Sequence, residues 1–504
     1  MLKTSPYPCI FKGVNQRGSC SVYDRNDSYR YLQIEGRITL SVQADSFFKR
    51  TVVPMHVLFF HLILSNARRA LWRNIHRLPT SLVKRWQMRE LRPLLRQSYR
   101  HVRLYKKLLD ERNVRPEEVR SHADMRKLPV TSKKLFRQSS PGEYINGSFP
   151  RWSYEWTETS GSTGEPFKFP LNRSFYFFKK YYCGTPTCSW YNDRKRLFDA
   201  GFYGRRFLLW RGWSSRELAN NFKFADIRTV SRPRGKHFLH IPVSDLRENP
   251  LLVVKKLREF QPDVLSGRAT TMVELHRIIK KAGSQEGLRV PFITSVGEML
   301  TETQRRYLEN GFNCEVYEQY GVEELGDVAV ECRYHRGMHI YEESNIVEIV
   351  DENNDPLPPG SRGLVVVTNL CNYSVPFIRY DTGDNGEILP GRCPCGVSAR
   401  RLKLYGRMGA YLELAGRHYQ FPEFAAVVNN FNSIVLRSQI AKVSDTSIEF
   451  RFIPLRPVSS EETDEITSSF AKSLGIAPRV KIVEDLPFNE SGKTQFLVDE
   501  TSHR

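Results

Sequence analysis

Apolar residues recur at helical spacing from Arg89 onward, and this spacing predicts a pair of amphipathic helices. The apolar positions are Leu91, Leu94, Leu95, Tyr99, Leu104, Leu108 and Leu109. Residues 68–107 also contain thirteen lysines and arginines and a single acidic residue, Glu90. The sequence therefore predicts a basic helical arm, and a solvated face is the usual role of such a charge run.

Short apolar runs alternate with helix-like stretches between residues 207 and 350. Residues 264–266 and 293–297 have strand character, whereas the apolar residues of 272–281 repeat at helical spacing. This alternation is typical of α/β layers with largely parallel strands. In residues 341–367 the pattern changes to two apolar runs around a long polar turn, which predicts a β-hairpin.

The last part of the chain has the pattern of a smaller unit. Apolar and polar residues alternate over residues 448–452, as they do on a half-buried strand. Ser459 and Glu462 have the spacing of a capping box, and the helical repeat after them stops at Gly475. The predicted fold class is therefore α/β, with a large multilayer N-terminal domain and a smaller α+β C-terminal domain.

Size and charge narrow the class of protein. A chain of 504 residues is too long for one core, and 40% hydrophobic with 12% aromatic residues exclude a disordered or fibrous protein. The 76 basic and 55 acidic residues give a net charge of +21, which favours anionic partners such as nucleotides, CoA, nucleic acid or membrane headgroups. Because no recognised nucleic-acid-binding motif accompanies the basic arm, we expect no specific nucleic-acid partner.

The cysteines and the apolar runs indicate in which cellular compartment the protein acts and whether it spans a membrane. Nine cysteines at irregular spacing do not resemble a secreted disulfide scaffold, and they indicate a reducing cytoplasm. The longest apolar stretch, residues 52–65, is shorter than the roughly 20 residues that span a bilayer, so we expect no transmembrane helix. A docked amphipathic segment is favoured there over a peripheral membrane contact. A homodimer is compatible with the sequence.

A loop rich in glycine and hydroxyl side chains has the composition of a phosphate clasp. Its residues are Thr159, Ser160, Gly161, Ser162, Thr163 and Gly164. Backbone N–H groups and hydroxyls could converge there on phosphate oxygens without a Cβ in the way. Taken alone, the loop is equally well explained as a solvent-exposed Ser/Gly segment, and it lacks the Gly-Lys-Ser/Thr ending of a Walker loop.

Five motifs follow one another along the chain: TSGSTGEP at 159–166, YGVEELG at 320–326, RYDTGD at 379–384, YGRM at 405–408 and SGKTQ at 491–495. In this order they resemble the adenylate-forming superfamily, and in particular its phenylacetate-CoA ligase branch. The resemblance spans roughly residues 88 to 500. It implies activation of a small carboxylic acid by ATP to an acyl-adenylate, release of pyrophosphate, and transfer of the acyl group to CoA.

The resemblance also implies a domain plan. Residues 88–406 would form the large adenylation domain that binds ATP and the acid. Residues 407–504 would form a small mobile domain that carries the catalytic lysine. Residues 1–87 are expected to be a basic and partly helical N-terminal extension, and the first 80 of them have no counterpart in the family.

Residue roles follow from the same resemblance. Tyr320 and Gly321 would lie against the nucleotide, where an aromatic face can stack on adenine. Glu324 would hold Mg²⁺ among phosphate oxygens. A carboxylate can accept hydrogen bonds from both ribose hydroxyls, and Asp384 matches the ribose-binding aspartate of the family. Taken without the other motifs, the Tyr-Gly-acid cluster and the Gly-Asp pair are also common in plain turns.

Two basic residues complete the expected nucleotide site. Arg407 matches the arginine just before the hinge between the domains, where a guanidinium can reach ribose or phosphate; a surface arginine is the alternative. Lys493 matches the lysine that meets both the carboxylate and the α-phosphate, where an ammonium neutralises developing charge. A solvated lysine in a turn is the alternative for this position.

The chain departs from the family pattern at three places. Glu323 stands where Ser or Thr is usual, and Glu165 stands where the phosphate loop usually has Lys. Residues 408–410 read Met-Gly-Ala, where one or two aspartates are usual after the hinge arginine. The altered hinge and Glu165 leave open a nucleotide-binding protein with impaired turnover. The basic residues and the N-terminal extension are equally compatible with a relative from a capsular or exopolysaccharide cluster that uses another acceptor.

Cysteine and histidine residues form a second candidate site. Cys332, His339, Cys393 and Cys395 supply three thiolates and one imidazole, a set suited to tetrahedral Zn²⁺. Members of the phenylacetate-CoA ligase branch have similar positions. His335 competes with His339 as the nitrogen ligand, and a structural zinc is favoured here over free buried thiols.

Overall fold

The computed structural model describes residues 20–23, 29–32, 78–151, 154–158, 167–172, 206–209, 228–232, 236–241, 245–283, 288, 290–407, 411–488 and 494–501. The chain divides into two compact units, Met1–Arg69 and Ala70–Arg504. The first contains an antiparallel pair, β1 (Cys20–Tyr23) and β2 (Tyr29–Leu32). All features described below belong to the second unit.

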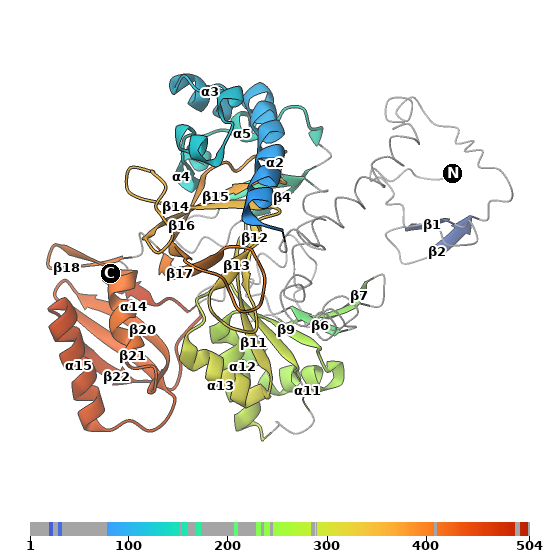
Figure 1. The fold of residues 1–504 in the computed structure, drawn as a ribbon. Helices are drawn as coiled ribbons and strands as arrows, with labels where there is room; N and C mark the ends of the chain where they lie inside the picture. Colours follow the sequence, from blue (N-terminus) through green and yellow to red (C-terminus); the bar gives the residue numbers. More distant parts are fainter. Residues whose placement is uncertain are drawn as a thin grey trace. The chain divides into compact units, whose positions relative to one another are not determined.

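One mixed sheet of 13 strands runs through the described residues of the second unit (Figure 1). In order across the sheet, its strands are β14 (Asn345–Val350), β15 (Arg362–Asn369), β16 (Tyr380–Leu389), β17 (Arg401–Arg407), β13 (Met338–Ile340), β12 (Gly326–Glu331), β11 (Glu315–Val322), β10 (Phe292–Val296), β9 (Val264–Gly267), β6 (Arg206–Leu209), β8 (Lys236–His240) and β7 (Arg228–Arg232). The short β3 (Thr131–Ser132) adds to β16 in parallel.

The part of the sheet around β9, β10 and β11 is parallel and is covered by helices (Figure 1). These helices are α10 (Asp245–Glu248), α11 (Pro250–Phe260), α12 (Ala269–Lys281) and α13 (Glu302–Phe312). Leu265 and Ile293 from the strands pack with Val273 and Leu308 from the helices in one buried cluster. The α/β layers expected for this region are confirmed.

Beyond β11 the sheet becomes antiparallel. The turn at Glu324 and Leu325 connects β11 to β12, and β14 pairs with β15 around the polar segment that follows Val350. The hairpin expected in residues 341–367 is therefore confirmed. The change from parallel to antiparallel pairing occurs at the strand that carries Tyr320, which places this residue at a topological boundary of the sheet.

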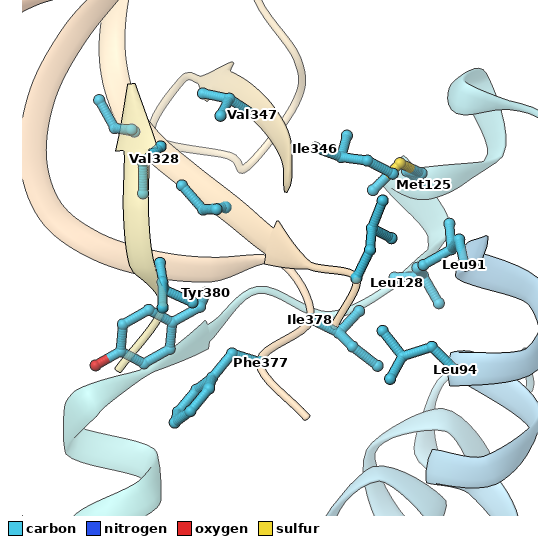
Figure 2. Packing of buried hydrophobic residues seen from close by; sticks show 14 of the residues in the cluster. Leu91, Leu94, Met125, Leu128, Val328, Ile346, Val347, Phe377, Ile378 and Tyr380 are labelled. Atoms are coloured by element: carbon cyan, nitrogen blue, oxygen red, sulfur yellow. The ribbon is translucent and has the colours of Figure 1, made fainter. Parts of the chain in front are cut away.

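Two helices, α2 (Thr80–His101) and α3 (Arg103–Glu111), confirm the expected helix pair, although α2 begins at Thr80 rather than near Arg89. Leu91 and Leu94 of α2 pack against Ile378 and neighbouring residues of the sheet region (Figure 2). Burying one such leucine stabilises the fold by about 1.5–3 kcal/mol. The basic helix is therefore a wall of the core on one face, and only its other face is solvated.

Short elements follow this helix pair and lead to the hairpin that flanks the candidate phosphate loop. They are the 3₁₀ helices η3 (Pro116–Glu118) and η4 (His122–Lys127), the helices α4 (Lys133–Gln138) and α5 (Pro141–Tyr144), and the antiparallel strands β4 (Tyr154–Glu158) and β5 (Lys168–Asn172). An aromatic group that includes Phe136, Phe377 and Tyr380 ties α4 to the sheet.

The C-terminal part contains its own small sheet and core. Its elements are β18 (Tyr411–Leu414), β19 (Arg417–Gln420), α14 (Phe421–Asn429), β20 (Val435–Ser444), β21 (Ser447–Pro454), α15 (Ser460–Leu474), β22 (Arg479–Ile482) and β23 (Leu497–Asp499). Ser459 Oγ accepts a hydrogen bond from the Glu462 N–H, and Gly475 ends α15 with φ of 73°. The expected capped helix is confirmed, and α15 packs on a four-stranded sheet.

The sequence predicted no transmembrane helix. Within the described part of the chain, no helix combines the length and the apolar character needed to cross a bilayer. The apolar stretch at residues 52–65 lies outside the described residues.

Candidate active site

Three motifs that are distant in the sequence meet at the carboxylate of Asp384. The Tyr320 hydroxyl donates a hydrogen bond of 2.7 Å to Asp384 Oδ2, and Arg407 Nε lies 3.4 Å from Oδ1. Strand pairing brings two of these residues together, because Asp384 in β16 lies directly opposite Arg407 in β17. Tyr320 reaches the same carboxylate from β11. The residues expected to bind the nucleoside are therefore brought together.

Burial shifts the pKa values of both Asp384 and Tyr320. Burial raises the pKa of Asp384 above its ordinary value, while Arg407 and the hydrogen bond from Tyr320 favour the charged form. Burial and the charge of Asp384 raise the pKa of Tyr320 well above its ordinary value. Tyr320 is therefore a neutral donor at physiological pH. A carboxylate oxygen can accept more than one hydrogen bond, so Asp384 keeps acceptor capacity for a ligand.

Gly321 has a structural reason to be glycine. The pairing of β11 with β12 shifts its register between Tyr320 and Gly321. A Cβ at Gly321 would lie 3.1 Å from the carbonyl oxygen of Gly326, closer than ordinary van der Waals contact. Bulges of this kind re-aim neighbouring side chains, and Tyr320 is the neighbour here. A contact of Gly321 with the nucleotide stays a prediction.

A second carboxylate, that of Glu324, lies in the turn between β11 and β12 and is buried. The Tyr380 hydroxyl donates a hydrogen bond of 3.0 Å to Glu324 Oε1, and Lys133 Nζ lies 3.7 Å from the same oxygen. Burial lowers the pKa of Lys133 from its ordinary value, and the charge of Glu324 opposes this effect. The sequence predicted Glu324 as a site residue but missed both Lys133 and the tyrosine.

Arg379, which precedes that tyrosine in the RYDTGD motif, has a different role. Its guanidinium is buried and donates hydrogen bonds to Glu348 Oε2 at 3.2 Å and to the carbonyl oxygens of Leu128 and Asn354, each at 2.9 Å. Its backbone has φ of 45°, a left-handed conformation that few non-glycine residues adopt. Arg379 therefore fixes the start of β16, and the ribose-binding role of Asp384 later in the same strand stays a prediction.

Several expected site residues lie outside the described residues. They are the phosphate-loop residues Thr159, Ser160, Gly161, Ser162, Thr163 and Gly164, together with Glu165, Met408, Gly409, Ala410 and Lys493. The strands on both sides of the loop are described, and Glu158 at the end of β4 pairs with Lys168 at the start of β5. The roles of the loop and of the lysine stay predictions.

Four side chains form a compact cluster with the chemistry of a metal site. The ligand atoms of Cys332, His339, Cys393 and Cys395 all lie within 4.8 Å of one another. Cys332 Sγ is 3.6 Å from Cys393 Sγ, and Cys395 Sγ is 3.3 Å from His339 Nε2. Four ligands around one zinc ion would place sulfurs about 3.8 Å apart, given Zn–S bonds of about 2.3 Å. The geometry therefore fits a tetrahedral site.

The surroundings orient the imidazole of this cluster. His339 Nδ1 lies 3.2 Å from the carbonyl oxygen of Ala399, which can only accept, so Nδ1 carries the hydrogen and Nε2 faces Cys395. The hydrogen bond from the Cys332 thiol, against burial and with help from His339, lowers the pKa of Cys395 well below its ordinary value. A thiolate and an imidazole lone pair that face each other need a cation between them, either a proton or a metal ion.

The competing histidine lies elsewhere. His335 Nδ1 is 3.1 Å from Glu331 Oε2 and 3.0 Å from Arg305 Nη1, so this histidine belongs to an ionic group with Glu331 and Arg305. Of the two candidate histidines, only His339 belongs to the cluster of metal-ligand atoms found among the described residues. The structure thus identifies His339, rather than His335, as the candidate nitrogen ligand.

The fold is that of the two-domain adenylate-forming CoA ligases. 2-Hydroxyisobutyryl-CoA ligase, in its postadenylation state with R3-HIB-AMP, matches 84% of this chain and 91% of its own with a TM-score of 0.66 at 17% identity. The same enzyme in its thioesterification state, with 2-HIB-AMP and CoA, gives a TM-score of 0.56 over 84% of this chain and 92% of its own at 17% identity. The predicted fold class is confirmed.

Curated relatives agree with this fold. A phenylacetate-coenzyme A ligase of Thermus thermophilus is 25% identical over 462 residues, which cover 84% of this chain and 97% of the relative. The phenylacetate-coenzyme A ligase of Escherichia coli is 25% identical over 320 residues, covering 60% and 67%. Protein CapK of Staphylococcus aureus is 26% identical over 208 residues, covering 41% and 42%. No protein-family model matches the chain. The resemblance to the phenylacetate-CoA ligase branch is thus confirmed.

Proposed function

We propose that this protein is an AMP-forming acid–thiol ligase. It joins a carboxylic acid to AMP with release of pyrophosphate and then transfers the acyl group to a thiol, that of CoA. The observation that carries the proposal is the meeting of Tyr320 and Arg407 at the buried Asp384, on a fold shared with adenylate-forming CoA ligases. These residues come from three of the five motifs. A plain turn or a surface position could account for any one motif, but it would not explain why all three residues meet at one carboxylate.

The chemistry of the site fits a nucleotide. Asp384 is positioned to accept hydrogen bonds from the ribose hydroxyls, while Tyr320 and Arg407 fix the orientation of its carboxylate. The same Tyr320 ring offers an aromatic edge of the site to the adenine base. Glu324, buried beside Tyr380, offers carboxylate oxygens of the kind that Mg²⁺ prefers. Bound Mg²⁺ would supply charge neutralisation on the phosphates.

In the first half-reaction, a carboxylate oxygen of the acid attacks the α-phosphorus of ATP, and the bond to the bridging oxygen breaks. The electron pair stays with that oxygen in the departing pyrophosphate. We propose that Lys493 neutralises the charge that develops at the carboxylate and the α-phosphate. Residues 88–406 form the adenylation domain in this proposal, and residues 407–504 form the small domain that turns about Arg407 between the half-reactions.

A panel assay tests the proposal. Purified protein is incubated with ATP, Mg²⁺ and a series of carboxylic acids, and pyrophosphate release is followed with and without CoA. We expect acid-dependent release, and we expect it to vanish in Asp384→Ala and Lys493→Ala. Lys472→Ala, an exposed lysine of α15, is the matched control and should keep full activity. ATP binding without pyrophosphate release for any acid would instead favour a nucleotide-binding protein with impaired turnover.

An acceptor other than CoA is the second candidate. Similarity to protein CapK, which is not named as a CoA ligase, favours keeping this alternative, as do the residues after the hinge arginine. The same assay separates the two. Release of pyrophosphate that does not depend on CoA, with no thioester formed, would favour another acceptor.

We also propose that the cluster of Cys332, His339, Cys393 and Cys395 binds a structural Zn²⁺. The compact geometry and the oriented imidazole support this assignment. Such an ion would connect β12 and β13 to the segment between β16 and β17. The free thiols among the described cysteines agree with a reducing cytoplasm as the site of action.

A further inference from the structure

The exposed face of α2 carries a row of arginines. They recur three or four positions apart, so they lie on one side of the helix. The members of this row, all of them exposed, are Arg85, Arg89, Arg92, Arg96 and Arg100. At a helical rise of about 1.5 Å per residue, the row is roughly 22 Å long. These five residues are called the arginine strip below.

Acidic side chains do not neutralise the arginine strip. Within the described residues, none of its five members forms an ion pair with an aspartate or a glutamate. The single acidic residue of α2, Glu90, is buried. Arg92 and Arg96 donate hydrogen bonds to backbone carbonyl oxygens, at 3.1 Å and 3.4 Å, and such contacts leave the guanidinium charge in place. The strip therefore creates a local positive potential that attracts anions.

The opposite face of α2 fixes the helix to the core. Leu91 and Leu94 are buried there and pack with Ile378 (Figure 2). Gln87 Nε2 donates hydrogen bonds of 3.0 Å to the carbonyl oxygens of Glu342 and Asn345. Because the apolar face is already occupied, a partner of this helix meets its guanidinium groups. Because the backbone is held, binding has to order only the side chains of the strip.

An exposed leucine extends the strip at its N-terminal end. Leu82 lies three positions before Arg85 and seven before Arg89, which places it on the same side of α2, and it is 42% exposed. The amino-acid sequence that precedes the helix has the same two properties. Residues 52–65 are apolar, and residues 66–79 contain four arginines and no acidic residue. Basic and apolar character therefore occur together at this end of the strip.

A bilayer that contains anionic phospholipids matches this combination. Its headgroup phosphates attract guanidinium groups, and the boundary beneath the headgroups accepts apolar side chains. Nucleic acid also offers phosphates, but proteins that bind its single strands stack bases on accessible aromatic rings. The two aromatic residues of α2 do not offer such rings, because Trp86 is buried and Tyr99 is half-buried beneath the guanidinium of Arg115. Lipid headgroups are therefore the better match.

We infer that the arginine strip of α2 is a docking surface for a membrane that carries anionic phospholipids. The contact is peripheral: the guanidinium groups pair with headgroup phosphates, and Leu82 enters the headgroup region. Each arginine beside such a surface increases the partition constant about fivefold, so the five together contribute roughly a thousandfold. The inference does not depend on the proposed function, and the docking surface consists of described residues alone.

Co-sedimentation of the full chain with vesicles tests the inference. One set of vesicles contains equal parts of phosphatidylglycerol and phosphatidylcholine, and the other contains phosphatidylcholine alone. We expect binding to the first set only, and weaker binding at about 1 M salt, where the Debye length falls to about 3 Å. A variant with Arg85, Arg89 and Arg96 all changed to Gln should bind about 100-fold more weakly. The matched control changes three exposed lysines elsewhere to Gln and should bind like wild type; these are Lys280, Lys281 and Lys472.

Two further variants separate charge from folding. The same three arginines changed to Lys should recover most of the affinity, because headgroup phosphates attract either cation. Leu82→Ser should weaken binding severalfold at low and at high salt and should leave the melting temperature unchanged. Wild-type protein that ignores anionic vesicles would overturn the inference, and so would a Gln variant that binds like wild type. Tighter binding to polyuridylate RNA than to vesicles would overturn it in favour of a nucleic-acid partner.

Discussion

Glu318 offers a quantitative test of the buried electrostatics behind the site, because it lies in β11, the strand that carries Tyr320. Burial and the nearby charge of Glu331 raise the pKa of Glu318 to about 7, although the Leu300 N–H donates to its Oε1 at 3.2 Å. Glu331 itself is paired with Arg305 at 2.7 Å. Within the described residues, a negative charge on Glu318 would share Arg305 with Glu331 and would have no ion-pair partner of its own.

The sign of the effect follows from proton binding. The ordinary pKa of a glutamic acid is 4.5, so between this value and about 7 the folded protein holds a proton that the unfolded chain releases. Stability therefore falls as pH rises through this window and becomes level above it. At about 1.4 kcal/mol per pH unit, the loss amounts to about 3 kcal/mol, which some solvent exposure of the side chain reduces to about 2 kcal/mol.

Glu318→Gln removes the titrating group and keeps an oxygen that can accept from the Leu300 N–H. We expect the variant to match wild type near pH 5 and to be more stable by about 2 kcal/mol near pH 8. Urea unfolding of the full chain across this range measures the difference, and Glu315→Gln, at the exposed start of β11, is the control. A variant that gains no stability between the two pH values would refute the reasoning.

Three further substitutions test the sites. Tyr320→Phe removes a hydrogen bond that favours the charged form of the buried aspartate; ATP affinity should fall about tenfold, and titrations should lose ATP binding at a higher pH than in wild type. Cys332→Ser should lower both the zinc content and the melting temperature, whereas His335→Asn should retain the metal; equal zinc in both variants would contradict the ligand set. Gly406→Ala forces a Cβ into the ring of Phe421 at φ of 107°, so calorimetry should show a loss of about 2–4 kcal/mol, and an unchanged melting profile would count against this packing.

Elements with local signals could be predicted from the sequence. The helix α15 has its start in the Ser459 cap and its end in Gly475, and both signals lie within the element itself. The start of α2 was missed because its first turns have no leucine repeat. Trp86 and Gln87 are buried there because they donate hydrogen bonds to backbone carbonyls of residues 342–345, far along the chain. Such long-range partners leave no trace in local spacing.

The residues of the candidate site likewise fall into those that the sequence predicted and those that only the structure revealed. The motifs predicted Asp384 and Glu324, because acidic residues at these positions have a defined task in the resembling family. The motifs could not show which cation accompanies each carboxylate, because this depends on strand register. Lys133 follows residues 128–132, which match no motif, and the pairing of β3 with β16 brings it beside Glu324. The choice of His339 over His335 likewise depended on the folded chain, because His339 lies in β13 beside the cysteines whereas His335 lies in the preceding turn beside Glu331.

The paired charges suggest how a site with two buried carboxylates can accept an anionic substrate. Left alone, Asp384 and Glu324 would repel a triphosphate and would be costly to bury. With Arg407 and Lys133 beside them, each carboxylate is already neutralised before the nucleotide arrives. In the proposed function, ribose hydroxyls would take over the oxygens of Asp384, and Mg²⁺ would take over those of Glu324. The cations beside the two carboxylates thus offset the cost of burying them in the ligand-free protein.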